Sequence, residues 1–97
     1  MTSAAKFWIE TPLTNVEALI ADYNDCAERA DQDLKSVYLD DAADYKVALE
    51  LFRASDAETL AEHVTDLDTC SRDGIVVAFQ KDCGDEFVES ILGFSLR

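Results

Sequence analysis

The chain has 97 residues, of which 48% are hydrophobic, and its 21 acidic side chains against 8 basic ones give a net charge of −13. This length and composition predict one domain with its own core, and they exclude a disordered chain because the apolar residues are plentiful and periodic. The charge excludes direct binding to DNA, RNA or anionic membranes and favours basic protein partners.

The cysteines indicate a reducing compartment. Cys26, Cys70 and Cys83 leave one thiol unpaired in any disulfide scheme, and they form no C-x-x-C motif. The sequence has no charged start followed by an apolar run, and no apolar stretch is long enough to cross a bilayer. We therefore expect a soluble, cytoplasmic protein without a signal peptide.

The chain opens with a predicted strand and a predicted helix. Residues 6–10 (KFWIE) indicate a short strand that ends at Thr11-Pro12. Residues 14–30 indicate a helix that starts at a capping box, Thr14 to Glu17. Its apolar residues recur at the spacing of one helical face, namely Val16, Leu19, Ile20, Tyr23, Ala27 and Ala30.

The middle of the chain reads as a hairpin of two strands. Residues 34–39 (LKSVYL) are a strand candidate, and the acidic run 40–44 indicates a turn. Residues 45–51 alternate between apolar and polar or small side chains, which favours a second strand. The alternative is a helix that carries Tyr45, Ala48, Leu49 and Phe52 on one face.

A second helix and a last strand follow. Residues 55–58 (SDAE) form another capping box, and an apolar stripe follows it at Ala57, Leu60, Ala61, Val64 and Leu67. A turn at residues 72–74 leads to the apolar run 75–79 (IVVAF), which is typical of a well-covered strand. Residues 85–92 indicate a short closing helix with Gly93 at its C-terminal cap.

The predicted order is β-α-β-β-α-β with a short C-terminal helix or strand. This is the ferredoxin-like split βαβ pattern, an α+β fold in which two antiparallel helices cover one face of a four-stranded antiparallel sheet.

The residues needed for catalysis or metal binding are not assembled in this sequence. His63 is the only histidine, and no Cys/His pair has the ligand spacing of a zinc site. Asp31-x-Asp33 and Asp66-x-Asp68 lack the remaining positions of a calcium loop, and the three glycines form no phosphate-binding loop. We therefore predict that the protein is not an enzyme and holds no cofactor or metal.

The ferredoxin-like order also raises the possibility of RNA recognition. Trp8, with Tyr45 or Phe52, falls where such domains carry stacking aromatic side chains. Phosphate contacts need Lys or Arg, however, and 21 carboxylates oppose them. These aromatic residues are therefore predicted to lie in the core or in a protein-contact patch.

The acidic residues are the predicted binding site. In the split βαβ fold Glu28, Asp31 and Asp33 would lie near Asp56 and Glu58, and Asp22 and Asp25 would run beside Glu62 and Asp66. Two such rows would present a charge every ~2–2.5 Å, against ~1.7 Å in B-DNA. At the opposite edge Asp40, Asp41 and Asp44 would approach Asp68 and Asp73. The predicted partner-binding residues are Asp22, Asp25, Glu28, Asp31, Asp33, Glu58, Glu62 and Asp66.

An alternative interpretation of the same acidity is solvation or adaptation to high salt. Asp22, Asp25 and Glu28 are like charges at helical spacing, and each such pair destabilises a helix by about 0.2–0.5 kcal/mol. A protein from a high-salt organism would also be rich in Asp and poor in Lys.

The chain is small, strongly acidic and without catalytic residues, and it carries the acidic rows Asp22-Asp25-Glu28 and Glu58-Glu62-Asp66. In these features it resembles the small acidic inhibitors of phages and mobile elements. These are the DNA-mimicking anti-CRISPR and antirestriction proteins, which share no sequence motif. The resemblance implies a stoichiometric inhibitor, acting in a bacterial host cell, that blocks the DNA-binding channel of a CRISPR surveillance complex or a similar defence nuclease.

Two further hypotheses belong to other classes. The chain could be an immunity or antitoxin protein that neutralises one basic toxin nuclease through a smaller patch. It could also be a ferredoxin-like interaction module that uses its open sheet face, with Trp8 and Tyr45, while its acidity is haloadaptive.

Overall fold

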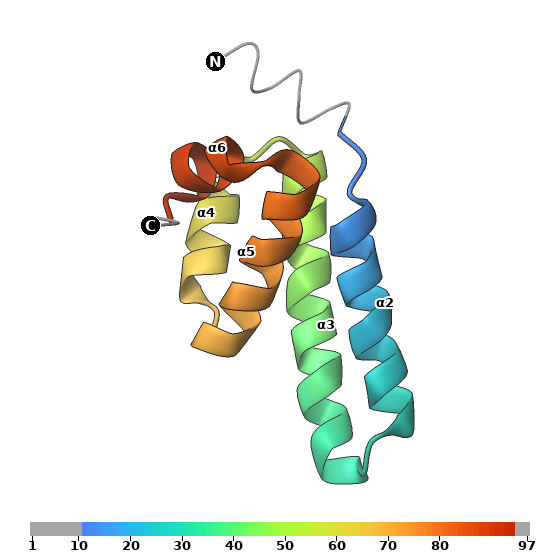
Figure 1. Cartoon of the computed structure of the whole chain (residues 1–97). Helices are drawn as coiled ribbons and strands as arrows, with labels where there is room; N and C mark the ends of the chain where they lie inside the picture. Colours follow the sequence, from blue (N-terminus) through green and yellow to red (C-terminus); the bar gives the residue numbers. More distant parts are fainter. Residues whose placement is uncertain (1–10, 95–97) are drawn as a thin grey trace.

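The computed structural model describes residues 11–94, and all regular structure in this range is helical (Figure 1). The elements are α2 (Thr14–Arg29), α3 (Gln32–Arg53), α4 (Ala57–Asp66), α5 (Thr69–Cys83), α6 (Asp85–Phe87) and a π-helical turn, η1 (Val88–Leu92). Because residues 11–94 contain no strand, the predicted α+β, ferredoxin-like fold is wrong. The strand expected at residues 6–10 lies outside the described residues.

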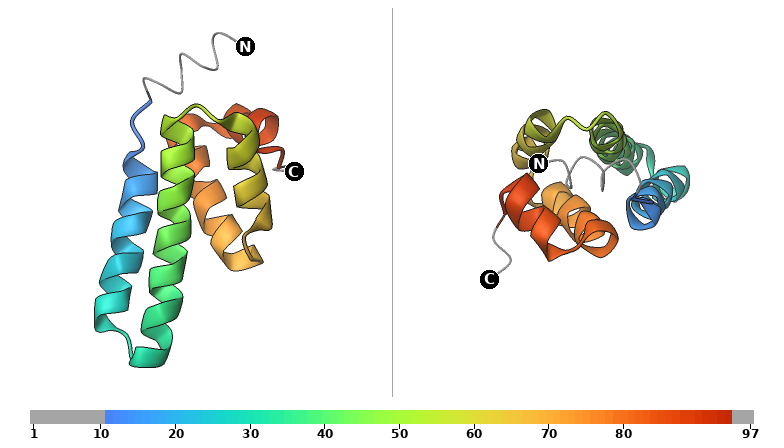
Figure 2. Two further views of the ribbon diagram at one scale, coloured as in Figure 1. Left: turned by 180° about the vertical axis from the view of Figure 1, so that it is seen from behind. Right: turned by 90° about the horizontal axis from the view of Figure 1, so that it is seen from above.

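Two helical hairpins of unequal length make up the fold. The long hairpin of α2 and α3 runs along the molecule, whose extents are 45 × 25 × 21 Å. The shorter pair, α4 and α5, packs against only one half of it, and α6 with η1 closes that end (Figure 1). Seen from above, α3 and α5 lie between α2 and α4 (Figure 2). The other half of the α2–α3 hairpin projects beyond the α4–α5 connection.

Helix α3 replaces the predicted strand, turn and strand of residues 34–51. Its buried residues are Ala42, Tyr45, Ala48 and Phe52, which follow the helical spacing of three or four, whereas Val47 of the alternating pattern is 40% exposed. The acidic run 40–44 contains no glycine or proline, so nothing in it ends a helix. The alternative interpretation of residues 45–52 as a helix is the one that the structure confirms.

Helix α5 replaces the strand predicted at residues 75–79. Ile75, Ala78 and Phe79 are buried while Val77 is 45% exposed, which is the signature of a helical face. A five-residue apolar run fits a buried helix as well as a strand. The expected turn at residues 72–74 lies inside this helix, where Gly74 permits close packing: a Cβ on it would lie 3.0 Å from the Tyr45 hydroxyl.

The predicted helices are confirmed, but their predicted N-terminal caps are wrong. Helix α4 begins after Asp56, not Ser55, and the Asp56 carboxylate accepts from the Thr59 N–H at 3.1 Å. Thr14 makes no capping hydrogen bond. The closing helix at residues 85–92 is confirmed as α6 and η1, and Gly93 ends it in the left-handed conformation (φ 79°).

The start of α2 is capped instead from α5. The Asp82 carboxylate accepts hydrogen bonds from the backbone N–H groups of Asn15 and Val16 at 3.0 and 2.9 Å, and from the Asn15 side chain at 2.7 Å. A carboxylate at a helix N-terminus is also favoured by the helix dipole. Asp82 therefore fixes the packed end of the long hairpin to α5.

Three phenylalanine rings hold the packed end together. Phe52 of α3, Phe79 of α5 and Phe87 of α6 form a triangle with ring centroids 5.5–5.6 Å apart. Burial of such rings dominates the stability of a small core. The rest of the core lies around them, formed by Leu13, Val16, Tyr45, Ala48, Leu60, Val64, Ile75, Ala78, Val88 and Leu92.

Candidate partner-binding surface

Acidic side chains are concentrated on the half of the long hairpin that α4 and α5 leave uncovered or only partly covered. We call residues 22–44 the distal hairpin. It carries eight carboxylates and only two basic side chains, Arg29 and Lys35. Five of the eight predicted partner-binding residues belong to it, and all five are exposed: Asp22, Asp25, Glu28, Asp31 and Asp33.

The local structure leaves most of these charges without a partner. Arg29 forms an ion pair with Asp25 one turn away on α2, the one ion pair among residues 11–94. Both side chains are solvated, so this pair contributes little to stability. Asp31 stands at the N-cap position of α3 without a side-chain capping bond, and Asp33 lies in the first turn of that helix. The positive end of the α3 dipole favours both charges.

The other three predicted residues lie elsewhere. Glu58, Glu62 and Asp66 are exposed on α4, and Glu62 and Asp66 line a shallow depression on that helix with Ala61 and Thr65. Helices α2 and α4 are on opposite sides of the molecule, with α3 and α5 between them (Figure 2). The prediction that Asp22 and Asp25 run beside Glu62 and Asp66 is therefore wrong, because the sheet that would have aligned the two helices does not form.

The acidic run 40–44 was also predicted to approach Asp68, and part of it does so, although between two helices rather than at the edge of a sheet. Ser71 in the first turn of α5 donates its backbone N–H to Asp68 and its hydroxyl to Asp41 of α3, both at 2.9 Å. The expected approach of the acidic run 40–44 to Asp68 is thus found between two helices. Asp41 thereby ties α3 to α5, while Asp68 caps the N-terminus of α5, so both carboxylates have a structural role.

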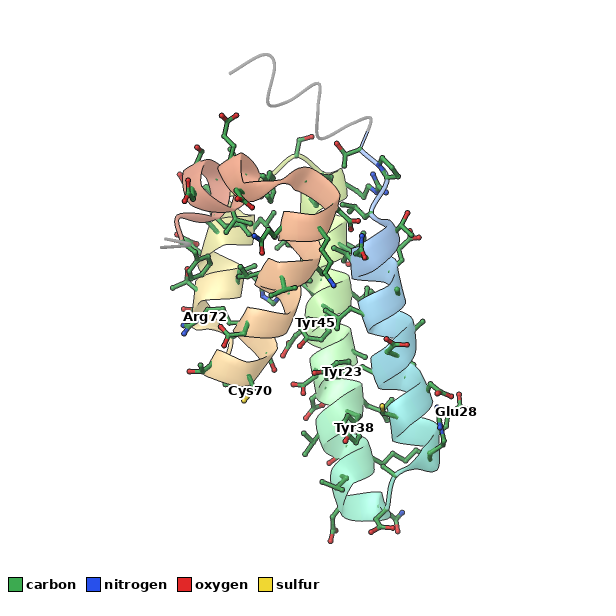
Figure 3. All side chains as sticks on the ribbon, in the orientation of Figure 1. Tyr23, Glu28, Tyr38, Tyr45, Cys70 and Arg72 are labelled. Carbon is green, nitrogen blue, oxygen red and sulfur yellow. The ribbon has the colours of Figure 1, made fainter. Side chains whose placement is uncertain are left out.

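A chain of tyrosine rings leads from the core to the distal hairpin. Tyr45 is fully buried and packs edge-to-face on Tyr23 with centroids 5.0 Å apart, and Tyr23 packs on Tyr38 at 6.0 Å. The three rings follow one another along the hairpin (Figure 3). Burial raises the pKa of Tyr45 well above its ordinary value, and its hydroxyl has no hydrogen-bond partner. Tyr45 is thus unavailable to the sheet-face hypothesis, and Trp8 lies outside the described residues.

The remaining polar candidates have structural roles. The His63 Nε2–H donates to the backbone carbonyl of Asp44 at 2.9 Å and so ties α4 to α3. Burial, with the neighbouring Asp82 charge, raises the pKa of the Cys83 thiol to about 12, which keeps it protonated at neutral pH. Across residues 11–94 no group of three or more His, Cys, Asp or Glu side chains is arranged to hold a metal ion.

Exposed apolar side chains on the distal hairpin are the feature that sequence reasoning missed. Leu34 and Val37 of α3 are each 51% exposed. The strand predicted at residues 34–39 did not indicate which side chains would lie next to Leu34 and Val37. The signal that could have found them is the helical spacing of Leu34, Tyr38 and Tyr45, which extends the buried face of α3 toward the tip.

Comparison of the chain with protein-family models, curated proteins and solved structures gives no significant match. Among residues 11–94 no helix is long and apolar enough to cross a membrane.

Proposed function

We propose that the chain is a stoichiometric protein inhibitor whose distal hairpin docks into the basic, nucleic-acid-binding channel of a partner protein. A CRISPR surveillance complex or a similar defence nuclease is the favoured partner. The observation that carries the proposal is the concentration of carboxylates on two helices whose other ends are held in the packed half of the fold.

The density of charge supports this function. Residues 32–44 of α3 span about 20 Å at 1.5 Å per residue, and α2 runs antiparallel beside this segment (Figure 1). Six of the eight carboxylates are exposed, and along that length they give one charge for about every 3.3 Å, against about 1.7 Å for B-DNA. A channel lined with Lys and Arg for a phosphate backbone has the complementary potential, and close charge pairs of this kind couple by ~1.5–7 kcal/mol.

The second candidate function is that of an immunity or antitoxin protein for one basic toxin nuclease. Leu34 and Val37 favour it, because exposed apolar side chains beside acidic ones suit a contact with one specific protein surface. A channel built for a phosphate backbone is complementary to the charges alone. This candidate shares the distal hairpin with the first. It differs in the partner and in the response to competing DNA.

The test is displacement of labelled double-stranded DNA from a purified CRISPR surveillance complex and from a restriction enzyme. We expect inhibition by the wild-type chain at a 1:1 ratio, and at least about a hundredfold weaker inhibition by the variant Asp22→Lys/Glu28→Lys/Asp33→Lys. The matched control is Glu58→Lys/Glu62→Lys/Asp66→Lys, which changes the net charge equally but on α4, and it should inhibit like wild type.

Equal inhibition by the folded distal-hairpin variant would contradict the proposed site. Failure to displace DNA, together with tight, DNA-independent binding to a toxin nuclease, would favour the immunity function instead.

A further inference from the structure

The long hairpin has a second surface suited to binding a helix, beyond the N-terminal end of α5. Helix α5 packs most closely against α2, and three side-chain contacts, each about one to two turns from the next, also hold it along α3. Phe79 stacks on Phe52 with centroids 5.6 Å apart. Gly74 lies against the Tyr45 hydroxyl, and Ser71 donates to Asp41.

Helix α5 begins at Thr69, so this series of contacts ends at Asp41. The face of α3 continues toward the tip with Tyr38, Val37 and Leu34, which the helical spacing places on or next to the same stripe as Tyr45. Tyr38 is partly buried and packs against Tyr23 of α2, whereas Leu34 and Val37 are each 51% exposed. Figure 3 shows Tyr38 beyond the end of α5 that carries Cys70. The stripe therefore has no covering helix over its last turns among the described elements.

We propose that this part of the long hairpin, which we call the distal seat (Tyr23, Leu34, Val37 and Tyr38), binds a basic amphipathic helix of the partner protein. The proposal rests on the proposed function and specifies how the partner is held. Residues 32–40 of α3 are about 13 Å long, which accommodates about two turns of a docked helix. An apolar side chain every three or four residues on such a helix would meet the seat.

Charge decides between a partner helix and a second copy of the chain. The distal hairpin, which contains the distal seat, carries eight carboxylates and two basic groups. Two copies paired there would bring two strongly negative surfaces into contact, which is unfavourable, whereas Lys and Arg on the polar face of a partner helix would meet the acidic rim. Asp33 and Asp22, both exposed, directly precede Leu34 and Tyr23 of the seat in the sequence.

The test uses a defined peptide as the probe. An 18-residue amphipathic helix of Leu and Lys is compared with a scrambled peptide of the same composition, and binding is measured by isothermal titration calorimetry. We expect the amphipathic peptide to bind about tenfold or more tightly than the scrambled one, with NMR shift changes centred on Leu34, Val37 and Tyr38.

Leu34→Ser/Val37→Ser should weaken amphipathic-peptide binding about tenfold or more. The matched control is Val47→Ser/Val77→Ser, which removes two similarly exposed apolar side chains (40% and 45%) from other surfaces and should leave binding unchanged. All four positions are exposed, so both variants should keep the wild-type melting temperature.

Equal binding of the two peptides, or equal effects of the two double variants, would overturn the distal seat while leaving the proposed function to the DNA-displacement test. Concentration-dependent dimerisation that Leu34→Ser/Val37→Ser abolishes would assign the seat to a second copy and also overturn the inference. The Leu34→Ser/Val37→Ser variant separates the two claims, since it removes the apolar seat and leaves every carboxylate of the distal hairpin in place, so that it should still inhibit in the DNA-displacement test if charge alone carries the proposed function.

Discussion

Asp82 caps a helix that lies 66 residues away in the sequence: its Oδ2 accepts from the backbone N–H of Val16 at 2.9 Å. Together with the bonds from Asn15, this carboxylate satisfies backbone donors that a helix N-terminus otherwise leaves free. It joins the packed end of the long hairpin to α5 and thereby sets the direction in which the distal hairpin projects.

Loss of this cap should destabilise the fold. We expect Asp82→Ala to lower the free energy of unfolding in urea by about 1–2 kcal/mol, the usual cost of removing a helix cap. Asp85→Ala is the control, since Asp85 is exposed and its carboxylate accepts only from the Gln80 side chain, and it should cost less than about 0.5 kcal/mol. Equal losses in the two variants would show that Asp82 does not anchor α2.

The contact between Gly74 and Tyr45 should reverse the usual effect of a helical glycine. Gly to Ala within a helix ordinarily stabilises by up to about 1 kcal/mol. A Cβ at Gly74 would lie 3.0 Å from the buried Tyr45 hydroxyl, so Gly74→Ala should destabilise. Tyr45→Phe removes a hydroxyl that has no partner, so we expect a nearly neutral effect.

Combining the two substitutions gives the decisive comparison. In the Tyr45→Phe background Gly74→Ala should become neutral or stabilising, a coupling that a double-mutant cycle in urea measures. Additive effects would mean that the helices separate enough to accept the extra methyl group.

Alkaline pH should weaken the fold through Cys83. Its thiol has a pKa of about 12 when buried, raised from 9.0, so above pH 9 the unfolded chain loses this proton first. The unfolded state then binds fewer protons, and the free energy of unfolding falls as pH rises from about 9 toward 12. Tyr45, with its pKa also raised by burial, acts in the same direction.

Urea unfolding at pH 8 and pH 10.5 measures this dependence. Cys83→Ala should reduce the loss between the two pH values, and Cys26→Ala, which changes an exposed cysteine, should leave it unchanged. Identical pH dependence in both variants would exclude Cys83 as a source.

Salt distinguishes a binding surface from haloadaptation. If the acidic surface serves a partner, the chain should be folded at low salt, and its melting temperature should change little between ~0.15 M and molar NaCl, because surface repulsion is already largely screened. A haloadaptive protein would need molar salt to fold. Circular dichroism melting from 10 mM to 2 M NaCl decides between them, and unfolding at low salt would remove the main support for a functional acidic surface.

The helices with clear one-sided periodicity, α2 and α4, could be predicted from the sequence. α3 and α5 could not, because Tyr45–Leu51 alternates by chance and IVVAF is apolar on both faces, so short-range pattern did not distinguish helix from strand. The acidic residues of the distal hairpin were identified from charge. Their separation from Glu58, Glu62 and Asp66, like the Asp82 cap, depends on tertiary packing that no local pattern contains.

Site-specific photo-crosslinking tests most directly whether the distal hairpin enters a nucleic-acid-binding channel. A photoreactive amino acid would replace exposed Ser36 of the distal hairpin or, as the control, exposed Thr65 of α4, and each chain would be irradiated with a purified CRISPR surveillance complex. We predict crosslinks from position 36 to the DNA-binding channel, lost when excess double-stranded DNA is added, and none from position 65. Crosslinks from position 65 alone, or from position 36 unchanged by DNA, would contradict the proposed mode of inhibition.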